Sequence, residues 1–210
     1  MVENQIDKLE NPIDFFGKWV ETGKDEGMEK SHSDSVKFMV NKVLKKNNSE
    51  FTFLDIGCGN GWVVRMLNNE PKCTFSVGVD GAKQMIEKAK SNGPDGCYYC
   101  SNLLDWNPNN KFDIIHSMEV MYYFNEPLEI FHKIYSQWIE DKGKFIFGID
   151  HYLENESAFN WPQECGVFMN TKSICEWIEM VKEARFKNIQ TWQVGVKDDW
   201  SGTLIIYGEK

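Results

Sequence analysis

The sequence contains no apolar run long enough to cross a membrane, and it is poor in basic residues. A membrane-spanning helix needs ~18 consecutive apolar residues, and the first residues, MVENQIDKLENP, lack the basic and then apolar layout of a secretory signal. Lysine and arginine number 23 against 32 aspartates and glutamates, and the resulting net charge of −9 repels polyphosphates. We therefore expect a cytoplasmic protein that acts neither in a membrane nor on nucleic acid.

Cysteines are few and scattered. Six occur in 210 residues, so a disulfide framework is not expected and the thiols should be reduced. Only Cys97 and Cys100 have the spacing of metal ligands, and no second pair of cysteines or histidines completes a zinc site. We expect no metal site and interpret these two residues as small apolar side chains.

Proline-rich or glycine-rich linkers, low-complexity segments and internal repeats are also missing. Hydrophobic residues make up 41% and aromatic residues 14% of the chain, a composition that excludes intrinsic disorder. The simplest organisation is an N-terminal helical segment, 1–50, followed by one domain, 51–210.

Short apolar runs alternate with amphipathic stretches from residue 51 onward. The strand-like runs are 51–56, 73–80, 97–100, 112–117, 144–150, 189–196 and 202–208. The helix-like stretches are 61–69, 82–90, 126–140 and 171–184. Such alternation predicts an α/β fold with a doubly wound, mostly parallel sheet of seven strands. No helix separates the last two strands, so they should form a C-terminal antiparallel hairpin.

The N-terminal segment has a different pattern. Residues 11–23 form a short amphipathic stretch, and residues 31–46 read as a helix with serine at its start and lysine at its end. Residues 23–32 lie between them and show no periodicity. They are either a surface loop or a lid over the site, with Trp19, Met28 and His32 as the candidates to close it.

The most informative stretch is FLDIGCGNG, residues 53–61, in which an apolar strand leads through Asp55 into alternate glycines. Glycine is needed where the backbone turns sharply from strand to helix and a ligand approaches the main chain closely. The helix that follows directs free N–H groups at that ligand, which favours an anionic group. The next strand ends in Asp80, whose carboxylate can accept hydrogen bonds from both hydroxyls of a ribose. A nucleoside cofactor is therefore expected.

These residues resemble the first motif of the class I S-adenosylmethionine-dependent methyltransferases. Proteins that bind nicotinamide cofactors more often carry Gly-x-Gly-x-x-Gly, and Trp62 stands where their last glycine would be. The resemblance implies S-adenosylmethionine as cofactor and S-adenosylhomocysteine as product. It also implies that Gly57 and Gly59 lie against the methionine part, that Asp55 supports the loop containing Cys58, and that Asp80 binds the ribose.

The resemblance extends to the residues after the second, third and fourth strands. It implies that Gly81 and Met85 flank the adenine, although a methionine on an amphipathic helix is as readily explained as core filler. Asn102 takes the place of an aspartate that contacts the adenine amine in many relatives, and Leu103 would pack on the ring. Ser117 and Met118 would border the methionine moiety.

Ligands of open α/β sheets bind beyond the carboxyl ends of the strands. The acceptor should therefore contact residues that follow the fourth and fifth strands, namely Glu119, Tyr122, Tyr123, Asp150, His151 and Tyr152, together with Trp161. This acidic and aromatic set suits a cationic or amine-bearing small molecule, unless it is a solvated loop with chance aromatics. Glu119, Asp150 and His151 are the candidate bases.

The prediction is an enzyme that transfers the methyl group of S-adenosylmethionine to a small-molecule acceptor. Two alternatives stay open: a nicotinamide-dependent oxidoreductase, and a non-catalytic cofactor-binding subunit of a larger complex. Neither the acceptor atom nor an oligomeric state follows from these residues.

Overall fold

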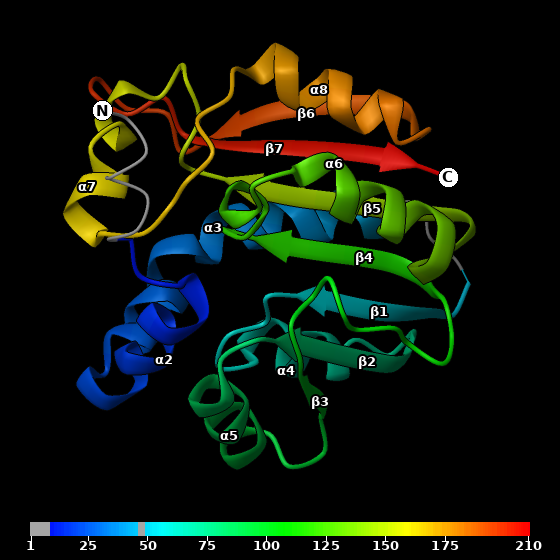
Figure 1. The fold of residues 1–210 in the computed structure, drawn as a ribbon. Helices are drawn as coiled ribbons and strands as arrows, with labels where there is room; N and C mark the ends of the chain where they lie inside the picture. Colours follow the sequence, from blue (N-terminus) through cyan, green and yellow to red (C-terminus); the bar gives the residue numbers. More distant parts are fainter. Residues whose placement is uncertain (1–8, 46–48) are drawn as a thin grey trace.

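Helices pack on both faces of a seven-stranded sheet in the computed structural model, which describes residues 9–45 and 49–210 (Figure 1). The strands are β1 (Phe51–Ile56), β2 (Cys73–Asp80), β3 (Cys97–Cys100), β4 (Phe112–Met118), β5 (Ile139–Ile149), β6 (Lys187–Val194) and β7 (Thr203–Glu209). Their order in the sheet is β3-β2-β1-β4-β5-β7-β6. The pairs among β1 to β5 are parallel, and β7 runs antiparallel to both β5 and β6. The predicted fold, including the closing hairpin, is confirmed.

The helices come mainly from the segments between strands and from the N-terminal region. They are α2 (Pro12–Thr22), α3 (Lys24–Leu44), α4 (Trp62–Asn68), α5 (Lys83–Asn92), α6 (Pro127–Lys133), α7 (Trp161–Cys165) and α8 (Ile174–Glu183). Short helical turns are η1 (Met121–Tyr123), η2 (Ile134–Trp138) and η3 (Glu156–Ala158). Among the described helices, none has both the length and the apolar character that a bilayer crossing requires.

Alternate residues of the central strands enter two hydrophobic clusters on opposite faces of the sheet. Phe53 of β1 packs in the cluster that contains residues of α3 and α4. Its neighbour Leu54 packs in the cluster that contains residues of α6 and α8. Both side chains are fully buried, and burying such a side chain stabilises the fold by about 1.5–3 kcal/mol. The sheet is therefore held rigidly from both sides, and its carboxyl-end loops are free to form a site.

Residues 24–32 are helical, so the expectation of an irregular surface loop is wrong, whereas a lid over the site stays a prediction. They form the first turns of α3, which runs to Leu44. They lack an apolar stripe because the buried residue in this part is Asp25, which accepts hydrogen bonds from the Asn60 amide (3.1 Å) and the Lys88 ammonium (2.9 Å). A helix anchored by polar contacts carries no hydrophobic period, which is why the sequence pattern missed it.

The predicted helix 126–140 is also shorter than expected. It continues from α6 through η2 and ends at Trp138, and Ile139 begins β5 by pairing with Phe112 of β4. Ile139 is completely buried, and a buried apolar residue is as typical of a helix as of a strand, so hydrophobicity alone does not distinguish helix from strand here. Pairing with a neighbouring strand decides its conformation.

Candidate active site

A cavity of about 530 Å³ opens at the carboxyl ends of β1, β2 and β4. Its walls come from the glycine loop after β1, from the residues that follow β2 and β4, and from α2 and α3. Figure 1 shows these two N-terminal helices beside that end of the sheet. The candidate cofactor residues that line it are Asp55, Gly57, Cys58, Gly59, Asp80, Gly81, Met85, Asn102 and Leu103. The candidate acceptor residues that line it are Glu119 and Tyr123.

Two features of the loop after β1 require glycine: its backbone conformation and the lack of space for a side chain at Gly57. Gly57, Gly59 and Gly61 all have positive φ, at 68°, 51° and 77°, a region that other residues enter only with strain. In addition, a Cβ on Gly57 would lie 2.2 Å from Cγ2 of Val120, so no side chain fits there. A Cβ on Gly59 would meet nothing within 4 Å, because this glycine faces the cavity. The loop is thus a bare backbone surface open to a ligand.

Asp80 holds this loop in place and faces the cavity. One carboxylate oxygen accepts a hydrogen bond from the Gly59 N–H at 2.9 Å, and the other accepts from the Ala82 N–H at 2.8 Å. Burial raises the pKa of Asp80, and the backbone hydrogen bonds partly offset that rise. Each carboxylate oxygen has two lone pairs, so capacity remains for the two hydroxyls of a ribose.

A buried pair links β1 to β4 at the base of the cavity. Nδ1 of His116 lies 2.7 Å from a carboxylate oxygen of Asp55, and the two residues are register neighbours in the sheet. His116 also lines the cavity, and its Nε2 is buried without a hydrogen-bond partner among the described residues. With Nδ1 hydrogen-bonded to the carboxylate, Nε2 is the ring nitrogen left to contact a ligand. Sequence reasoning missed this role; the register of β1 against β4 is the signal that would have found it.

The residues expected at the adenine end share the cavity wall. Gly81 lies beneath Ile13 of α2, whose Cδ1 would be 2.5 Å from a Cβ at that position. The Asn102 side-chain oxygen accepts a hydrogen bond from the Leu104 N–H at 2.9 Å, which orients the side chain in its loop. Met85 and Leu103 are almost fully buried beside them. The side chains of Ile13, Met85 and Leu103 give this part of the cavity an apolar wall, a surface that suits a flat aromatic base.

Glu119 stands at the opposite end of the cavity, immediately after β4. Its φ of 61° is strained for a residue with a side chain. Its carboxylate accepts hydrogen bonds from the Tyr122 hydroxyl at 2.7 Å and from the Asp150 N–H at 2.5 Å. Burial, and then the charge of Asp150, raise the pKa of Glu119 to about 8. A carboxyl group tuned to this range can take up or release a proton near neutral pH.

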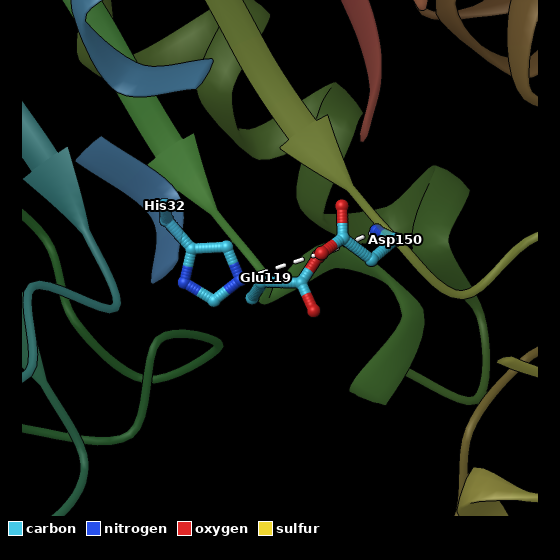
Figure 2. Close-up of side chains that lie close together, drawn as sticks. All are labelled: His32, Glu119 and Asp150. Atoms are coloured by element: carbon cyan, nitrogen blue, oxygen red, sulfur yellow. Dashed lines mark hydrogen bonds and ion pairs between the residues drawn. The ribbon is translucent and has the colours of Figure 1, made fainter. Parts of the chain in front are cut away.

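His32 reaches the same end of the cavity from α3, as Figure 2 shows. Its Nε2 lies 3.4 Å from a carboxylate oxygen of Asp150, and its Nδ1 lies 3.0 Å from the Met28 carbonyl oxygen. Burial lowers the pKa of His32, but the contact with Asp150 and the charge of Glu119 outweigh it, so the pKa is raised overall. Met28 lines the cavity as well, whereas Trp19 does not.

Several of the candidate site residues do not line the cavity. His151 is fully buried, with Nδ1 at 2.9 Å from the Ala158 carbonyl and Nε2 at 2.7 Å from the Thr171 hydroxyl. Both ring nitrogens are therefore occupied, and burial lowers its pKa. Neither ring nitrogen of His151 faces the cavity in this arrangement, and its role as a base stays a prediction.

Five further candidate residues also lie outside the lining of the cavity. The Tyr152 hydroxyl donates to the Gly202 carbonyl at 2.9 Å, and Trp161 packs against Trp200 with ring centroids 6.0 Å apart. The Ser117 hydroxyl donates to the Ile56 carbonyl at 2.9 Å and joins β4 to β1. Tyr122 does not line the cavity but contacts two residues that do, Glu119 and Tyr123. Asp150 does not line the cavity either, but it contacts two lining residues, His32 and Glu119.

Comparison with known proteins agrees with this architecture. A methyltransferase-domain family matches residues 26–191. The chain is 26% identical over 153 residues to a malonyl-[acyl-carrier protein] O-methyltransferase of Priestia megaterium, a match that covers 67% of this chain and 55% of that protein. The chain thus spans about half the length of this curated relative.

Solved structures show the same fold. A Haloferax volcanii methyltransferase in complex with the Trm112 methyltransferase activator superposes with a TM-score of 0.78 at 23% identity, covering 92% of this chain and 96% of that one. A Haemonchus contortus phosphoethanolamine N-methyltransferase bound to S-adenosylhomocysteine gives 0.68 at 14% identity, covering 84% and 52%. The fold and the glycine loop define a Rossmann-like methyltransferase. The chain belongs to the class I S-adenosylmethionine-dependent methyltransferases, and the oxidoreductase alternative is set aside.

Proposed function

We propose that this chain binds S-adenosylmethionine in the cavity and transfers its methyl group to a small-molecule acceptor. The observation that carries the proposal is that one cavity joins the glycine loop and Asp80 at one end to Glu119 and His32 at the other. The first pair of features suits a nucleoside cofactor, and the second offers groups that exchange a proton. A methyltransferase needs both within reach of one another.

The cavity residues fit the cofactor on three points. The open face of Gly59 accommodates the methionine moiety against the backbone, and Asp80 has lone pairs left for the ribose hydroxyls. The free Nε2 of His116 is an acceptor suited to an ammonium group. When bound, S-adenosylmethionine supplies an electrophilic methyl group on a sulfonium.

The remaining task of the chain is to align the acceptor and exclude water. Positioning of this kind can supply ~7–11 kcal/mol of the barrier. Phe16 of α2 packs edge-on against Tyr123, with ring centroids 5.3 Å apart, and closes the aromatic side of the cavity. Glu119 is the proposed base for a protonated nucleophile, and His32 and Asp150 are proposed to hold its charge state. The acidic and aromatic surroundings support an amine-bearing acceptor.

Two measurements test this proposal. In thermal denaturation, S-adenosylhomocysteine should raise the melting temperature of the protein because it binds the folded state preferentially, whereas NADH should leave the melting temperature unchanged. Incubation with S-adenosylmethionine and a panel of small amines and carboxylic acids should release S-adenosylhomocysteine. Stabilisation by NADH alone would contradict the cofactor, and release only with a macromolecular acceptor would contradict the acceptor class.

A cofactor-binding subunit of a larger complex is the second candidate. Strand β3 lies at the edge of the sheet, and Phe75 and Tyr99 on β2 and β3 are each 44% exposed although large and apolar. Exposed edge strands pair readily with other chains, and the Haloferax volcanii neighbour is itself in complex with an activator. Binding of S-adenosylhomocysteine without turnover of any small molecule would favour this candidate. We propose a reducing, cytoplasmic location for either function, since all six cysteines are free.

A further inference from the structure

A cluster of three ligand-type side chains at the acceptor end of the cavity goes beyond methyl transfer itself. His32, Glu119 and Asp150 each place one candidate ligand atom within 4.8 Å of the other two. They come from α3, from the residue after β4 and from the residue after β5, and Figure 2 shows them converging. We propose that these three residues bind a divalent first-row transition-metal ion.

The tautomer of His32 supports this assignment. Nδ1 lies 3.0 Å from the Met28 carbonyl oxygen, which can only accept, so Nδ1 carries the hydrogen. In the neutral ring, Nε2 then directs a lone pair at the carboxylate oxygen of Asp150, 3.4 Å away. A cation between the two lone pairs, either a proton or a metal ion, holds the two atoms at this distance, and a metal ion would take the place of that proton. A ring nitrogen bound to a backbone carbonyl, with the other nitrogen free, is also the usual orientation of a metal-binding histidine.

The carboxylates are oriented in the same manner. Tyr122 and the Asp150 N–H hold Glu119 by hydrogen bonds, as supporting residues commonly hold a carboxylate ligand. The Asp150 side chain is 7% exposed, and its Oδ1 has no hydrogen-bond partner among the described residues. A buried carboxylate oxygen without a donor is costly. The other oxygen, Oδ2, faces His32, and a cation bound by both carboxylate oxygens would also satisfy Oδ1.

The charge balance points the same way. Glu119 and Asp150 are both buried, and within residues 9–45 and 49–210 no lysine or arginine forms an ion pair with either carboxylate. Among the described residues, His32 is the basic group that forms an ion pair with Asp150. When both carboxylates are ionised, two negative charges face at most one positive charge, and a divalent ion would stabilise that ionised state.

The donor set indicates which ion fits. One imidazole nitrogen with two carboxylate oxygens suits Mn²⁺, Fe²⁺, Co²⁺ or Zn²⁺ better than Mg²⁺ or Ca²⁺, which prefer oxygen alone. Three protein ligands leave open positions, as in catalytic metal sites. His32 and Glu119 line the cavity, so an open position would face the acceptor. The proposed metal binding does not depend on the proposed function, whereas a role of the ion in holding an acceptor oxygen rests on that function.

This inference differs from the expectation of no metal site, which considered only the cysteine spacing. The three residues lie on separate elements with no motif spacing, so only the fold brings them together.

Titration of the chelator-treated protein with Mn²⁺, and separately with Zn²⁺, tests the proposal without any cofactor. We expect saturable binding of one ion per chain to the wild type. His32→Gln and Asp150→Asn should each weaken binding by about tenfold or more. His132→Gln, which changes an exposed histidine on α6, is the matched control and should bind as the wild type does. A Cys97→Ser, Cys100→Ser double variant should also retain binding.

Circular dichroism and binding of S-adenosylhomocysteine show whether each variant has folded. If a variant does not fold, electron spin echo spectra of Mn²⁺ on the wild type give the answer, since a bound imidazole nitrogen modulates the echo. The proposal is overturned if no saturable binding occurs, if His32→Gln and Asp150→Asn bind like the control, if the double cysteine variant loses binding, or if nitrogen modulation is absent. Loss of cofactor binding with intact metal binding would instead contradict the proposed function alone.

Discussion

Replacing Asp80 by asparagine tests whether this carboxylate both holds the glycine loop and binds the cofactor. Asparagine is nearly the same size but has one acceptor oxygen, so it cannot accept from both the Gly59 and the Ala82 N–H groups. A hydrogen bond to a charged acceptor contributes ~1.5–3 kcal/mol. We expect the free energy of unfolding to fall by about 1–3 kcal/mol, because one backbone N–H group in this region loses its partner.

Asp80→Asn should also weaken binding of the cofactor. Loss of one charged hydrogen bond to the ribose corresponds to about tenfold weaker binding, measured by isothermal titration with S-adenosylhomocysteine. Asp95→Asn removes the same charge from an exposed position and should leave both quantities unchanged. Unchanged affinity in Asp80→Asn would refute the assignment of the ribose to this residue.

Three further predictions concern the loop, the buried histidine and the proton-exchanging carboxyl group. Gly57→Ala should destabilise the fold by about 2 kcal/mol or more in urea denaturation, because the new Cβ would meet Val120 and the residue has positive φ. Gly27→Ala is the control: Gly27 lies in a helix with open space around it, so alanine should stabilise the fold by about 0.5–1 kcal/mol. Equal effects of the two substitutions would contradict the account. His116→Asn keeps a hydrogen-bond donor for Asp55 but removes Nε2. The melting temperature should therefore stay close to that of the wild type, while the affinity for S-adenosylhomocysteine, measured by titration, should fall about tenfold. An unaltered affinity would exclude contact between His116 and the cofactor. The pKa of Glu119 rises from an ordinary 4.5 to about 8 on folding, so its protonated form stabilises the fold at low pH and that contribution is lost as the pH rises toward 8. With a chelator present, urea denaturation of both proteins between pH 4.5 and 8 should therefore show the wild type losing stability relative to Glu119→Gln as the pH rises. If the free energies of unfolding of the two proteins change equally with pH, Glu119 does not titrate in this range.

The fold was predictable because its signals are local. Strand residues such as Phe53 and Leu54 alternate between two buried faces, and glycines mark the turn after β1. Local patterns of this kind determine element type and, through the handedness of crossover connections, the order of strands. The residues proposed to bind the cofactor could be picked from the same motifs, because they lie directly after β1 and β2.

The acceptor end could not be predicted in the same way. His32 was chosen only by its position in a stretch without periodicity, and its partner Asp150 lies far away in the chain. His151 was expected in the cavity because it directly follows Asp150, but a turn of the chain directs its ring to Ala158 and Thr171. Side-chain direction in irregular segments depends on tertiary hydrogen bonds, and a sequence pattern does not carry that information.

The central claim is that the glycine loop and Asp80 bind a methyl-donating nucleoside in a cavity shared with Glu119. A crystal structure with S-adenosylhomocysteine tests it most directly. We predict the ribose hydroxyls on the Asp80 carboxylate, the methionine moiety against Gly57 and Gly59, and the sulfur directed toward Glu119 and His32. A nucleoside bound elsewhere, or one whose contacts leave both the loop and Asp80 untouched, would contradict the account.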